Sequence, residues 1–476
     1  MVVPGCMMTL CGQFFWIWTN LLEAAQFCTF FRKFVRRWEN LDGVLIGKTA
    51  RSTIQTAIIN FALTRPVIFY CTLPLKKKTT MKLLILGAGG FIGVNLVERL
   101  LEDGVHDVIA VDINEDKMED LLKNPHPKLR YLHQDISDDA AMVGLVEESD
   151  VVVDLVAFAN PSLYVEDPIG VYDLNFTQNM KIVRHCQQFK KRLIQFSTCE
   201  VYGMTAAKVG EQFGLSTEEN KCVFEEDTTP MIMGPVKNHR WIYACAKQLL
   251  ERVLFALGKS EDFKFSIIRP FNFVGPRIDY LPSEEAGNPR VFSHFMDSLL
   301  YGTKPMRLVD GGNAWRAYTY ISDAVDCTVR IIEDKNNNCN GEIFNIGQPE
   351  NELQIKDMAV KMCDIFDKHF RIESDPPRPE IISVSGEEFY GKGYEDCDRR
   401  IPSIEKAEKL LGWSANYDID AVLTKTMEYF VTEHRKKAIV TNLPQADVTG
   451  VKSAILDTTL DTTSVTDDES AGSIKV

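Results

Sequence analysis

The sequence has no excess of positive charge. Its 476 residues carry a net charge of −14 at pH 7, and the pI is near 5.2. A nucleic-acid-binding protein needs a basic surface to neutralise phosphates, so the composition argues against that class. An anionic ligand therefore has to be bound by basic residues that gather locally. With 45% hydrophobic and 25% charged residues, the chain is that of a globular protein.

The 12 cysteines form no CxxC pair and show no regular spacing. This pattern argues against a disulfide framework and against a zinc site, and we expect no metal. Scattered thiols are typical of a reducing compartment, so we expect a cytoplasmic protein. The sequence also contains no internal repeat.

Residues 1–80 contain no uninterrupted apolar run of the ~20 residues that a membrane-spanning helix needs. Polar residues interrupt the apolar stretch 10–31, and the basic stretch RKFVRR follows it. Two interpretations stay open: a membrane-surface anchor or targeting segment, and a poorly ordered extension before a catalytic domain that starts at residue 81. Residues 435–476 lack aromatic residues and are rich in Thr, Ser and Asp, which predicts a disordered acidic tail.

A strand, a glycine turn and a helix are predicted over the stretch KLLILGAGGFIGVNLVERLLEDG. The glycines follow the pattern GxxGxxG at Gly87, Gly90 and Gly93, and Phe91 and Ile92 begin the helix. Such glycines let backbone N–H groups at the helix N-terminus approach a pyrophosphate, whose charge the helix dipole favours. We therefore expect these five residues to bind a dinucleotide.

The next two strands provide candidates for binding the adenosine part of that dinucleotide. The strand 107–112 ends in Asp112, whose carboxylate can accept both ribose hydroxyls and would repel a 2′-phosphate. The third strand, 128–137, ends at Asp135 and Ile136, which we expect to flank the adenine. These residues predict NAD, and not NADP, as the cofactor.

Further buried strands are predicted at 151–159, 192–198 and 263–270, separated by helical stretches. This alternation indicates an α/β fold, a Rossmann-type doubly wound parallel sheet, with a smaller C-terminal substrate-binding lobe. We place the nucleotide-binding part at 81–268 and the lobe mainly at 269–434. Ligands of such sheets lie at the carboxyl ends of the strands.

The strand 192–198 leads into FSTCEVYG, which places three reactive side chains at one of these ends: Thr198, Cys199 and Glu200. Tyr243 and Lys247 are four residues apart and share a helix face. A lysine ammonium beside a phenol lowers the pKa of the phenol, as a general base for an alcohol requires. A YxxxK pair is common by chance, but the strand-end hydroxyl and the nucleotide fold make the combination specific.

Over residues 82–430 the sequence resembles the extended short-chain dehydrogenase/reductase family. The resemblance implies that Thr198, Tyr243 and Lys247 are the catalytic hydroxyl, base and lysine, and that the protein is at least a homodimer. The family's sugar-nucleotide enzymes carry segments similar to RPFNFVGPR, RLVDGG and WRAYTYISDA of this chain. The uridine diphosphate contacts that this similarity implies are Asn272, Arg307 and Arg316.

Within the family, the segments PVKNHRWIYACAKQLLERV, GEIFNIGQPENE and EEFYGKGYEDCDRRIPSI are similar to those of two related groups. These are the UDP-glucuronate decarboxylase domains of bacterial bifunctional 4-amino-arabinose (polymyxin resistance) enzymes and the plant UDP-apiose/UDP-xylose synthases. The resemblance implies UDP-glucuronate as the substrate, with Glu200 and Arg400 as catalytic residues. The further substrate contacts that it implies are Ala159, Tyr164, Arg240 and Tyr394.

The chemistry of such a reaction agrees with these side chains. Oxidation of the C4″ hydroxyl makes a β-keto acid, which loses CO2 to leave an enolate that Tyr243 and Thr198 can hydrogen-bond. A glutamate ~4 Å from the substrate carboxylate costs about 4 kcal/mol at an effective dielectric constant of about 20. Arg400 can offset this cost, so we expect Arg400 to orient the carboxylate and relay a proton, and Glu200 to be a partly neutralised acid/base.

Several alternatives stay open. Cys199 matches a cysteine of the apiose synthases, but Ala159 stands where they have a second one, so plain decarboxylation is favoured over ring contraction to UDP-apiose. A UDP-sugar 4-epimerase or dehydratase would share the glycines and Tyr243 without needing Arg400. A non-catalytic NAD-sensing protein is the alternative from another class, and the intact catalytic residues argue against it. The role of Cys199 and the identity of the pentose product stay undecided.

Overall fold

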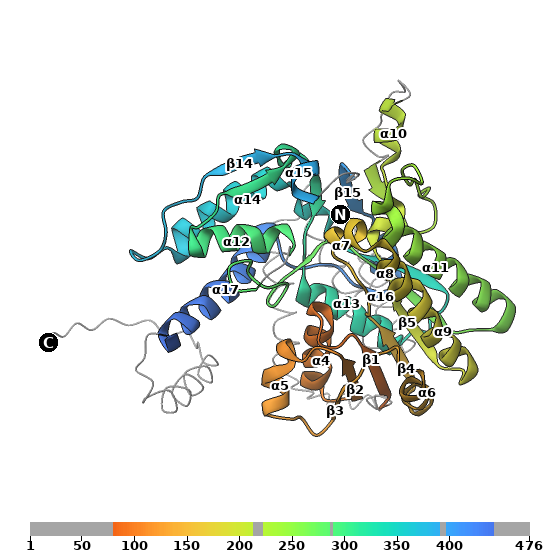
Figure 1. Cartoon of the computed structure of the whole chain (residues 1–476). Helices are drawn as coiled ribbons and strands as arrows, with labels where there is room; N and C mark the ends of the chain where they lie inside the picture. Colours follow the sequence, from red (N-terminus) through yellow and green to blue (C-terminus); the bar gives the residue numbers. More distant parts are fainter. Residues whose placement is uncertain (1–79, 213–221, 286–288, 391–396, 442–476) are drawn as a thin grey trace, which may run out of the picture. The chain divides into compact units, whose positions relative to one another are not determined.

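A seven-stranded parallel sheet forms the centre of the structure, a computed structural model that describes residues 80–212, 222–285, 289–390 and 397–441 (Figure 1). The strand order is β12-β7-β5-β4-β1-β2-β3, and every neighbouring pair is parallel. This confirms the predicted Rossmann-type fold class. The strands are β1 Lys82–Leu86, β2 Asp107–Asp112, β3 Leu129–His133, β4 Val151–Asp154, β5 Arg192–Phe196, β7 Phe265–Pro270 and β12 Glu342–Ile346.

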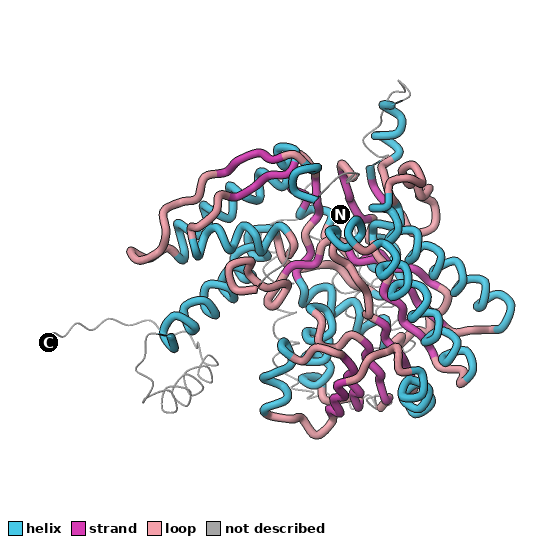
Figure 2. Tube along the Cα trace, viewed as in Figure 1, coloured by secondary structure: helices cyan, strands magenta, loops and turns pink. Residues whose placement is uncertain are grey.

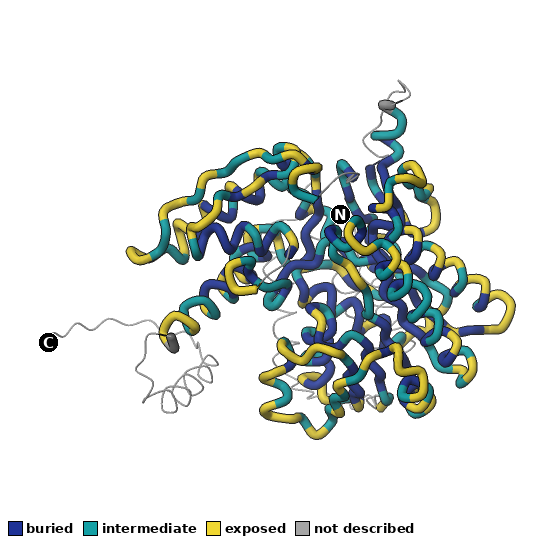
Figure 3. The backbone as a smooth tube through the Cα atoms, viewed as in Figure 1, coloured by how far each residue is buried: buried dark blue, intermediate teal, exposed yellow. Residues whose placement is uncertain are grey.

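Helices cover both faces of this sheet because successive strand residues point to opposite sides. Leu83 and Ile85 of β1 join one core cluster with α4 and α13, whereas Leu84 and Leu86 join another with α6, α9 and α11. Six of the seven strands are accordingly almost continuously buried, whereas the edge strand β3 has no buried residue (Figure 3). These helices are α4 Phe91–Asp103, α6 Asp139–Glu148, α9 Asn179–Gln188, α11 Ile242–Glu261 and α13 Ile321–Glu333.

The glycine turn joins β1 to α4 at close range. Gly87 has a φ of 81°, which favours glycine, and a Cβ atom at Gly93 would lie 2.2 Å from the carbonyl oxygen of Gly87. The absence of a side chain at Gly93 therefore lets the first turn of α4 pack directly on the end of β1. The Asp112 carboxylate accepts the N–H of Gly89 at 2.8 Å and fixes the turn from the end of β2.

Four strands differ from their predicted extents. β3 ends at His133 and not at residue 137, and β7 begins at Phe265 and not at residue 263. β4 ends at Asp154 and not at residue 159, because the Asp154 side chain accepts the N–H of Val156 at 3.0 Å and turns the chain. β5 ends at Phe196, two residues earlier than expected. The seventh strand, β12, was not predicted; it returns from the C-terminal part of the chain to pair with β7, so the nucleotide-binding part extends beyond residue 268.

The C-terminal lobe consists of helices and small sheets (Figure 2). α12, α14 and α17 contribute to the core cluster that also contains α4 and α13, so the lobe and one face of the central sheet share a core. The small sheets have the orders β13-β10-β15-β6, β14-β9 and β11-β8. Their bounds are β6 Val223–Phe224, β8 Phe273–Val274, β9 Met306–Val309, β10 Trp315–Ala317, β11 Thr319–Tyr320, β13 Glu352–Gln354, β14 Ile381–Val384 and β15 Arg399–Pro402.

Short helices complete the described part. η3 follows β5 directly, and η5 leads into α11. The helices of the lobe are α12 Val291–Tyr301, α14 Ile355–Ile365, α15 Gly386–Tyr390, α16 Glu405–Leu411 and α17 Ile419–Thr441. The others are α5 Glu119–Lys123, α7 Pro161–Glu166, α8 Pro168–Tyr172, α10 Ala206–Gln212, η1 Asp116–Met118, η2 Asp173–Gln178, η3 Cys199–Tyr202, η5 His239–Trp241, η6 Asp310–Gly312, η7 Pro349–Asn351 and η8 Phe366–Phe370.

The first residues of the predicted tail are helical. α17 continues through residues 435–441, because Arg435 donates to the Phe370 carbonyl at 2.6 Å and pairs with Asp375 at 3.2 Å. The remainder of the predicted tail, residues 442–476, and residues 1–79 of the N-terminal extension lie outside the described residues. None of the helices in the described part combines the length and apolar character that a membrane crossing requires.

Candidate active site

A cavity of about 460 Å³ lies at the carboxyl edge of the central sheet, lined by residues that directly follow β1, β4, β5 and β7. This is where a doubly wound sheet binds its ligands. It collects most of the residues predicted from the sequence for cofactor, catalysis and substrate. These are Gly87, Gly90, Phe91, Ile92, Gly93, Ala159, Tyr164, Thr198, Cys199, Glu200, Arg240, Tyr243, Asn272, Arg316 and Arg400.

A second cavity, of about 940 Å³, continues on the other side of the glycine turn. Gly87 and Gly90 line both cavities, and Asp112, Asp135 and Ile136 line the second. The three residues predicted to contact adenosine are thus brought together at the ends of β2 and β3. The two cavities follow the course expected of an extended dinucleotide, with the glycine turn under its pyrophosphate.

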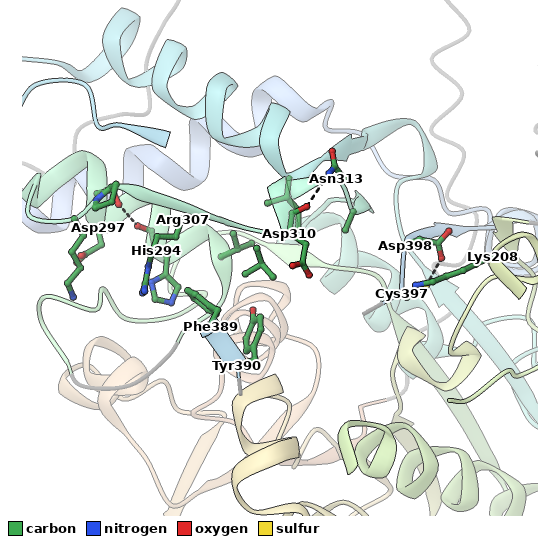
Figure 4. Close-up of a pocket in the computed structure, with 17 residues that line it drawn as sticks. Lys208, His294, Asp297, Arg307, Asp310, Asn313, Phe389, Tyr390, Cys397 and Asp398 are labelled. Carbon is green, nitrogen blue, oxygen red and sulfur yellow. Dashed lines mark hydrogen bonds between the residues drawn. The ribbon is translucent and has the colours of Figure 1, made fainter. Parts of the chain in front are cut away.

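Arg307 lines a third cavity, of about 410 Å³, in the C-terminal lobe (Figure 4). Its guanidinium lies 4.8 Å from the ring centroid of Phe389, and His294 meets the same ring edge-on at 5.5 Å. This cavity shares Val291, Ile355 and Tyr390 with the first one. Arg307 therefore lies beside the cavity of about 460 Å³ at the carboxyl edge of the sheet and does not line it. Tyr394, also predicted to contact substrate, lies outside the described residues.

η3 presents the reactive side chains that follow β5. Thr198 caps it, because its hydroxyl oxygen accepts the N–H of Glu200 at 3.1 Å. Arg240 Nη1 lies 2.6 Å from Glu200 Oε2, and Arg400 Nη1 lies 3.5 Å from Oε1. All three side chains of this ion-pair group are buried. Two guanidiniums beside one carboxylate favour its charged form, which differs from the partly neutralised acid that we predicted for Glu200.

Tyr243 lies in the same cavity and stacks on Tyr164, with ring centroids 4.8 Å apart and an interplanar angle of 11°. Burial raises the pKa of Tyr243, and the charge of Glu200 raises it further, while hydrogen bonding to Thr198 lowers it. The expected lowering of the Tyr243 pKa is therefore absent from the protein alone. Tyr243 and Lys247 lie one turn apart on α11, as predicted. The pKa of the Tyr243 phenol, however, is set mainly by burial and by the charge of Glu200.

Lys247 is buried behind the cavity. Its ammonium donates to the carbonyl of Phe196 at 3.1 Å and to Asn179 Oδ1 at 3.3 Å. Burial lowers the pKa of Lys247 to about 8, against the fields of Asp154 and Glu251, which raise it. The lysine is thus anchored at the end of β5.

Cys199 lines the cavity but is not an activated thiol. Burial raises its pKa to about 11, and Arg400 offsets only part of this rise. At neutral pH the thiol is therefore protonated. Ala159 lines the same cavity.

Arg290 and Asn179 are two polar residues at or near the cavity that were not predicted from the sequence. Arg290 lines the catalytic cavity at the start of α12; it pairs with Asp279 at 2.9 Å, and its guanidinium lies 5.6 Å from the Phe91 ring centroid. Asn179 holds Lys247 from α9. No motif marked Arg290. Asn179 is a polar residue at the start of a helix with a buried apolar face. This pattern alone is only weak evidence for a functional residue.

The cavity has a local excess of positive charge. Four arginines line it, but Glu200 is the single carboxylate among its described lining residues. In a chain with a net charge of −14, this meets the expectation that basic residues gather around an anionic ligand. The four arginines are Arg240, Arg290, Arg316 and Arg400.

A doubly wound sheet with a glycine turn, and with a tyrosine and a lysine one helical turn apart at its carboxyl edge, defines a short-chain dehydrogenase/reductase. The sequence profile described as "NAD dependent epimerase/dehydratase family" matches residues 83–347, more than half of the chain, and the protein belongs to this family. Both the extended short-chain dehydrogenase/reductase prediction and NAD as the cofactor are thereby confirmed.

Among curated proteins, the chain is 37% identical over 377 residues to the UDP-D-apiose/UDP-D-xylose synthase of Oryza sativa subsp. japonica, covering 77% of this chain and 93% of the synthase. Among solved structures, the PbgP3 protein of Burkholderia pseudomallei superposes with a TM-score of 0.64 at 32% identity, covering 75% of this chain and 98% of that one. The UDP-glucuronic acid 4-epimerase of Bacillus cereus, solved with UDP-glucuronic acid and NAD, has a TM-score of 0.58 at 22% identity and covers 74% and 99%, which shows the shared fold alone.

Proposed function

We propose that the protein catalyses the NAD-dependent oxidative decarboxylation of UDP-glucuronate, through a UDP-4-keto intermediate, to a UDP-pentose: UDP-4-keto-pentose or UDP-xylose. The observation that carries this proposal is the placement of Glu200 between Arg240 and Arg400, in the cavity that also holds Tyr243. An epimerase needs a base and a cofactor, but two arginines around a glutamate are suited to a substrate carboxylate. The name of the rice relative supports the same substrate class.

The positive excess of the cavity supports an acidic sugar nucleotide. UDP-glucuronate carries a pyrophosphate and a carboxylate. We assign the pyrophosphate to Arg316 and Asn272, with Arg307 reaching it from the neighbouring cavity. The carboxylate is assigned to Arg400, whose contact with Glu200 is the longer of the two, so that the close Arg240–Glu200 pair stays in place.

The redox step is assigned to Tyr243 and Thr198. The phenolate of Tyr243 removes the proton of the C4″ hydroxyl, and the Thr198 hydroxyl holds the same oxygen in position. The glycine turn and Asp112 would hold NAD, which would supply the two-electron oxidation at C4″. Lys247, fixed by Phe196 and Asn179, provides the nearby positive charge that favours the phenolate.

Decarboxylation then follows from the ketone. The C5″ carboxylate leaves as CO2, and the electron pair of the broken bond forms an enolate whose oxygen accepts hydrogen bonds from Tyr243 and Thr198. C5″ takes up a proton from solvent, relayed along the Glu200–Arg400 side of the cavity, and the proton that Tyr243 removed from the C4″ hydroxyl passes to solvent in exchange. Reduction of the ketone before release would give UDP-xylose, and release of the ketone itself would give the UDP-4-keto-pentose.

The test uses the full chain with NAD and UDP-glucuronate. CO2 is measured directly, NADH is followed at 340 nm, and the product is identified by NMR. UDP-glucose, which lacks the carboxylate, is the matched control and should release no CO2. Inversion at C4″ without CO2 would assign the protein to the epimerases, and absence of any turnover would support a binding protein.

Ring contraction to UDP-apiose is the second candidate, favoured by the rice relative and by Cys199 in the cavity. Replacement of Cys199 by serine distinguishes the two reactions. If the thiol takes part in the rearrangement, a branched product seen with the wild type disappears in Cys199→Ser while CO2 release continues.

We further propose a homodimer in the cytoplasm. Ile169 and Tyr172 of α8 and Leu249 of α11 leave large apolar surfaces exposed, with 73%, 39% and 46% of each residue accessible, which suits a partner subunit. The eight cysteines in the described part of the chain are free thiols, as in a reducing compartment. Light scattering of the purified chain tests the dimer, and fractionation of the native cells tests the compartment.

A further inference from the structure

Asp154 is a buried carboxyl group for which the proposed reaction has no use. It ends β4 beneath the catalytic cavity and is 0% exposed. Its Oδ1 accepts the N–H of Val156 at 3.0 Å, but Oδ2 has no hydrogen-bond partner among the described residues. A buried carboxylate without a full set of partners is costly, so it either takes up a proton or is stabilised by a compensating charge nearby.

Lys247 is the cation that reaches the same place. Asp154 pairs in register with Gln195 of β5, and Lys247 donates to the carbonyl of the next residue, Phe196. Asn179 links both sides: its Oδ1 accepts from Lys247 at 3.3 Å and from Gln195 at 3.5 Å. Asp154 and Lys247 therefore border the same two buried amides, Gln195 and Asn179, without forming a direct ion pair.

The directions of the pKa shifts of Asp154 and Lys247 agree with this geometry. Burial raises the pKa of Asp154, and Lys247 lowers it; burial lowers the pKa of Lys247 to about 8, and Asp154 is the strongest group opposing that fall. The buried thiol of Cys186 on α9 also senses Asp154, which contributes to its raised pKa. Tyr243 and Glu251 are further titratable groups on this face of α11.

A second carboxylate, Glu251, acts on Lys247 from the same helix. It is already compensated, because Arg269 holds both of its oxygens, Nε at 3.0 Å from Oε1 and Nη2 at 2.6 Å from Oε2. Neither residue is more than 3% exposed. Of the two carboxylates, Asp154 is thus the one whose compensation depends on the lysine.

We propose that Asp154 is a positioning residue for the redox step. Its buried carboxylate stabilises the positive charge of Lys247 and so keeps the lysine protonated in the working enzyme. This inference rests on the proposed catalytic role of Lys247. Without Asp154, the buried ammonium would lose its proton at lower pH, and the positive charge behind Tyr243 would be lost within the working range. The two groups then titrate as a coupled pair.

The test measures Lys247 directly and requires no turnover. The full chain is labelled with lysine carrying ¹³C at Cε, and the Lys247 signal is identified by its loss in Lys247→Arg. Its titration is followed by NMR in wild type and in Asp154→Asn. The midpoint should fall by roughly 0.5 to 1 pH unit in the variant, the usual effect of a nearby charge. Asp150→Asn is the matched control, because Asp150 is exposed just before the same strand.

An unchanged midpoint in Asp154→Asn, or an equal fall in Asp150→Asn, overturns the proposal. If Asp154→Asn does not fold, the coupling is tested through Asp154 in the Lys247→Met variant, with aspartate labelled with ¹³C at Cγ. Without the lysine charge, the Asp154 signal should titrate at higher pH than in the wild type. An unchanged titration overturns the proposal. The alkaline limit of NADH formation with UDP-glucuronate should fall with the lysine midpoint. Failure of turnover alone would count against the proposed function and leave the NMR result decisive for Asp154.

Discussion

Arg240 and Glu200 form a buried ion pair with 2.6 Å between Nη1 and Oε2, whereas Arg400 approaches the other oxygen of Glu200 at 3.5 Å. The two arginines are therefore not equivalent. Arg240 also lies over the ring of Trp241, at 4.5 Å from its centroid, which adds a second attachment. This asymmetry leads us to assign Arg240 to holding the glutamate and Arg400 to the substrate.

Substitution of each arginine by methionine should separate these roles. Arg240→Met leaves Glu200 buried with its weaker partner, so we expect the free energy of unfolding to fall by about 3–5 kcal/mol. Arg400→Met keeps the close pair, so the unfolding free energy should change little while CO2 release falls by roughly 10²–10³-fold. Denaturant unfolding and CO2 release measure the two effects. Equal losses of stability in the two variants would contradict the assignment.

The charge of Glu200 should be visible in the pH dependence of the redox step. Burial raises the pKa of Tyr243 and the negative charge of Glu200 adds to the rise, so Glu200→Gln should lower that pKa. Because the step requires the phenolate, activity is lost as the pH falls below this pKa. The acid limit of NADH formation should therefore move to lower pH in the variant. Single-turnover absorbance at 340 nm measures it, since oxidation precedes loss of CO2; a shift to higher pH would refute the assignment.

The parts of the fold that local sequence determines were predictable. The strand β1, the glycine turn and α4 follow each other without interruption, and near-continuous apolar runs indicated the buried parallel strands. The end of β4 was not predicted, because it depends on one hydrogen bond from the Val156 N–H to the Asp154 side chain. β12 was missed because its pairing with β7 joins segments more than 70 residues apart.

The candidate site divides in the same way. Motif spacing predicted that Thr198, Glu200 and Tyr243 lie close together at the carboxyl ends of the parallel strands. In the structure all three line one cavity. It could not show that Arg240 would be the closer partner of Glu200, nor that Arg307 would line a neighbouring cavity. These relations depend on the packing of residues from distant parts of the chain, which spacing along one helix or strand does not encode.

The close packing of the glycine turn should make it intolerant of a single methyl group. A Cβ atom at Gly93 would approach Gly87 O to 2.2 Å, so Gly93→Ala should lower the unfolding free energy by about 1–3 kcal/mol and weaken NAD binding. Gly144, in the middle of α6, has no neighbouring atom within 4 Å of the point that a Cβ would occupy. Gly144→Ala is therefore the control and should stabilise the protein by about 0.5–1 kcal/mol. Calorimetric NAD titration and denaturant unfolding test both; similar NAD affinities in the two variants would contradict the expectation.

The buried pair of Arg269 and Glu251 gives a test of how the catalytic helix is held. Arg269 of β7 binds both carboxylate oxygens of Glu251 on α11 and lies 4.6 Å from the ring centroid of Tyr202 in η3, so it joins the helix of Tyr243 to the segment of Glu200. Arg269→Met leaves a buried carboxylate without its partner and should cost about 3–5 kcal/mol of unfolding free energy. The double variant Arg269→Met with Glu251→Leu removes both charges and should recover most of that loss, because the desolvation cost disappears with the charge. Denaturant unfolding of the wild type, both single variants and the double variant measures the coupling, and a double variant no more stable than Arg269→Met would show that the pair acts through shape and not through charge.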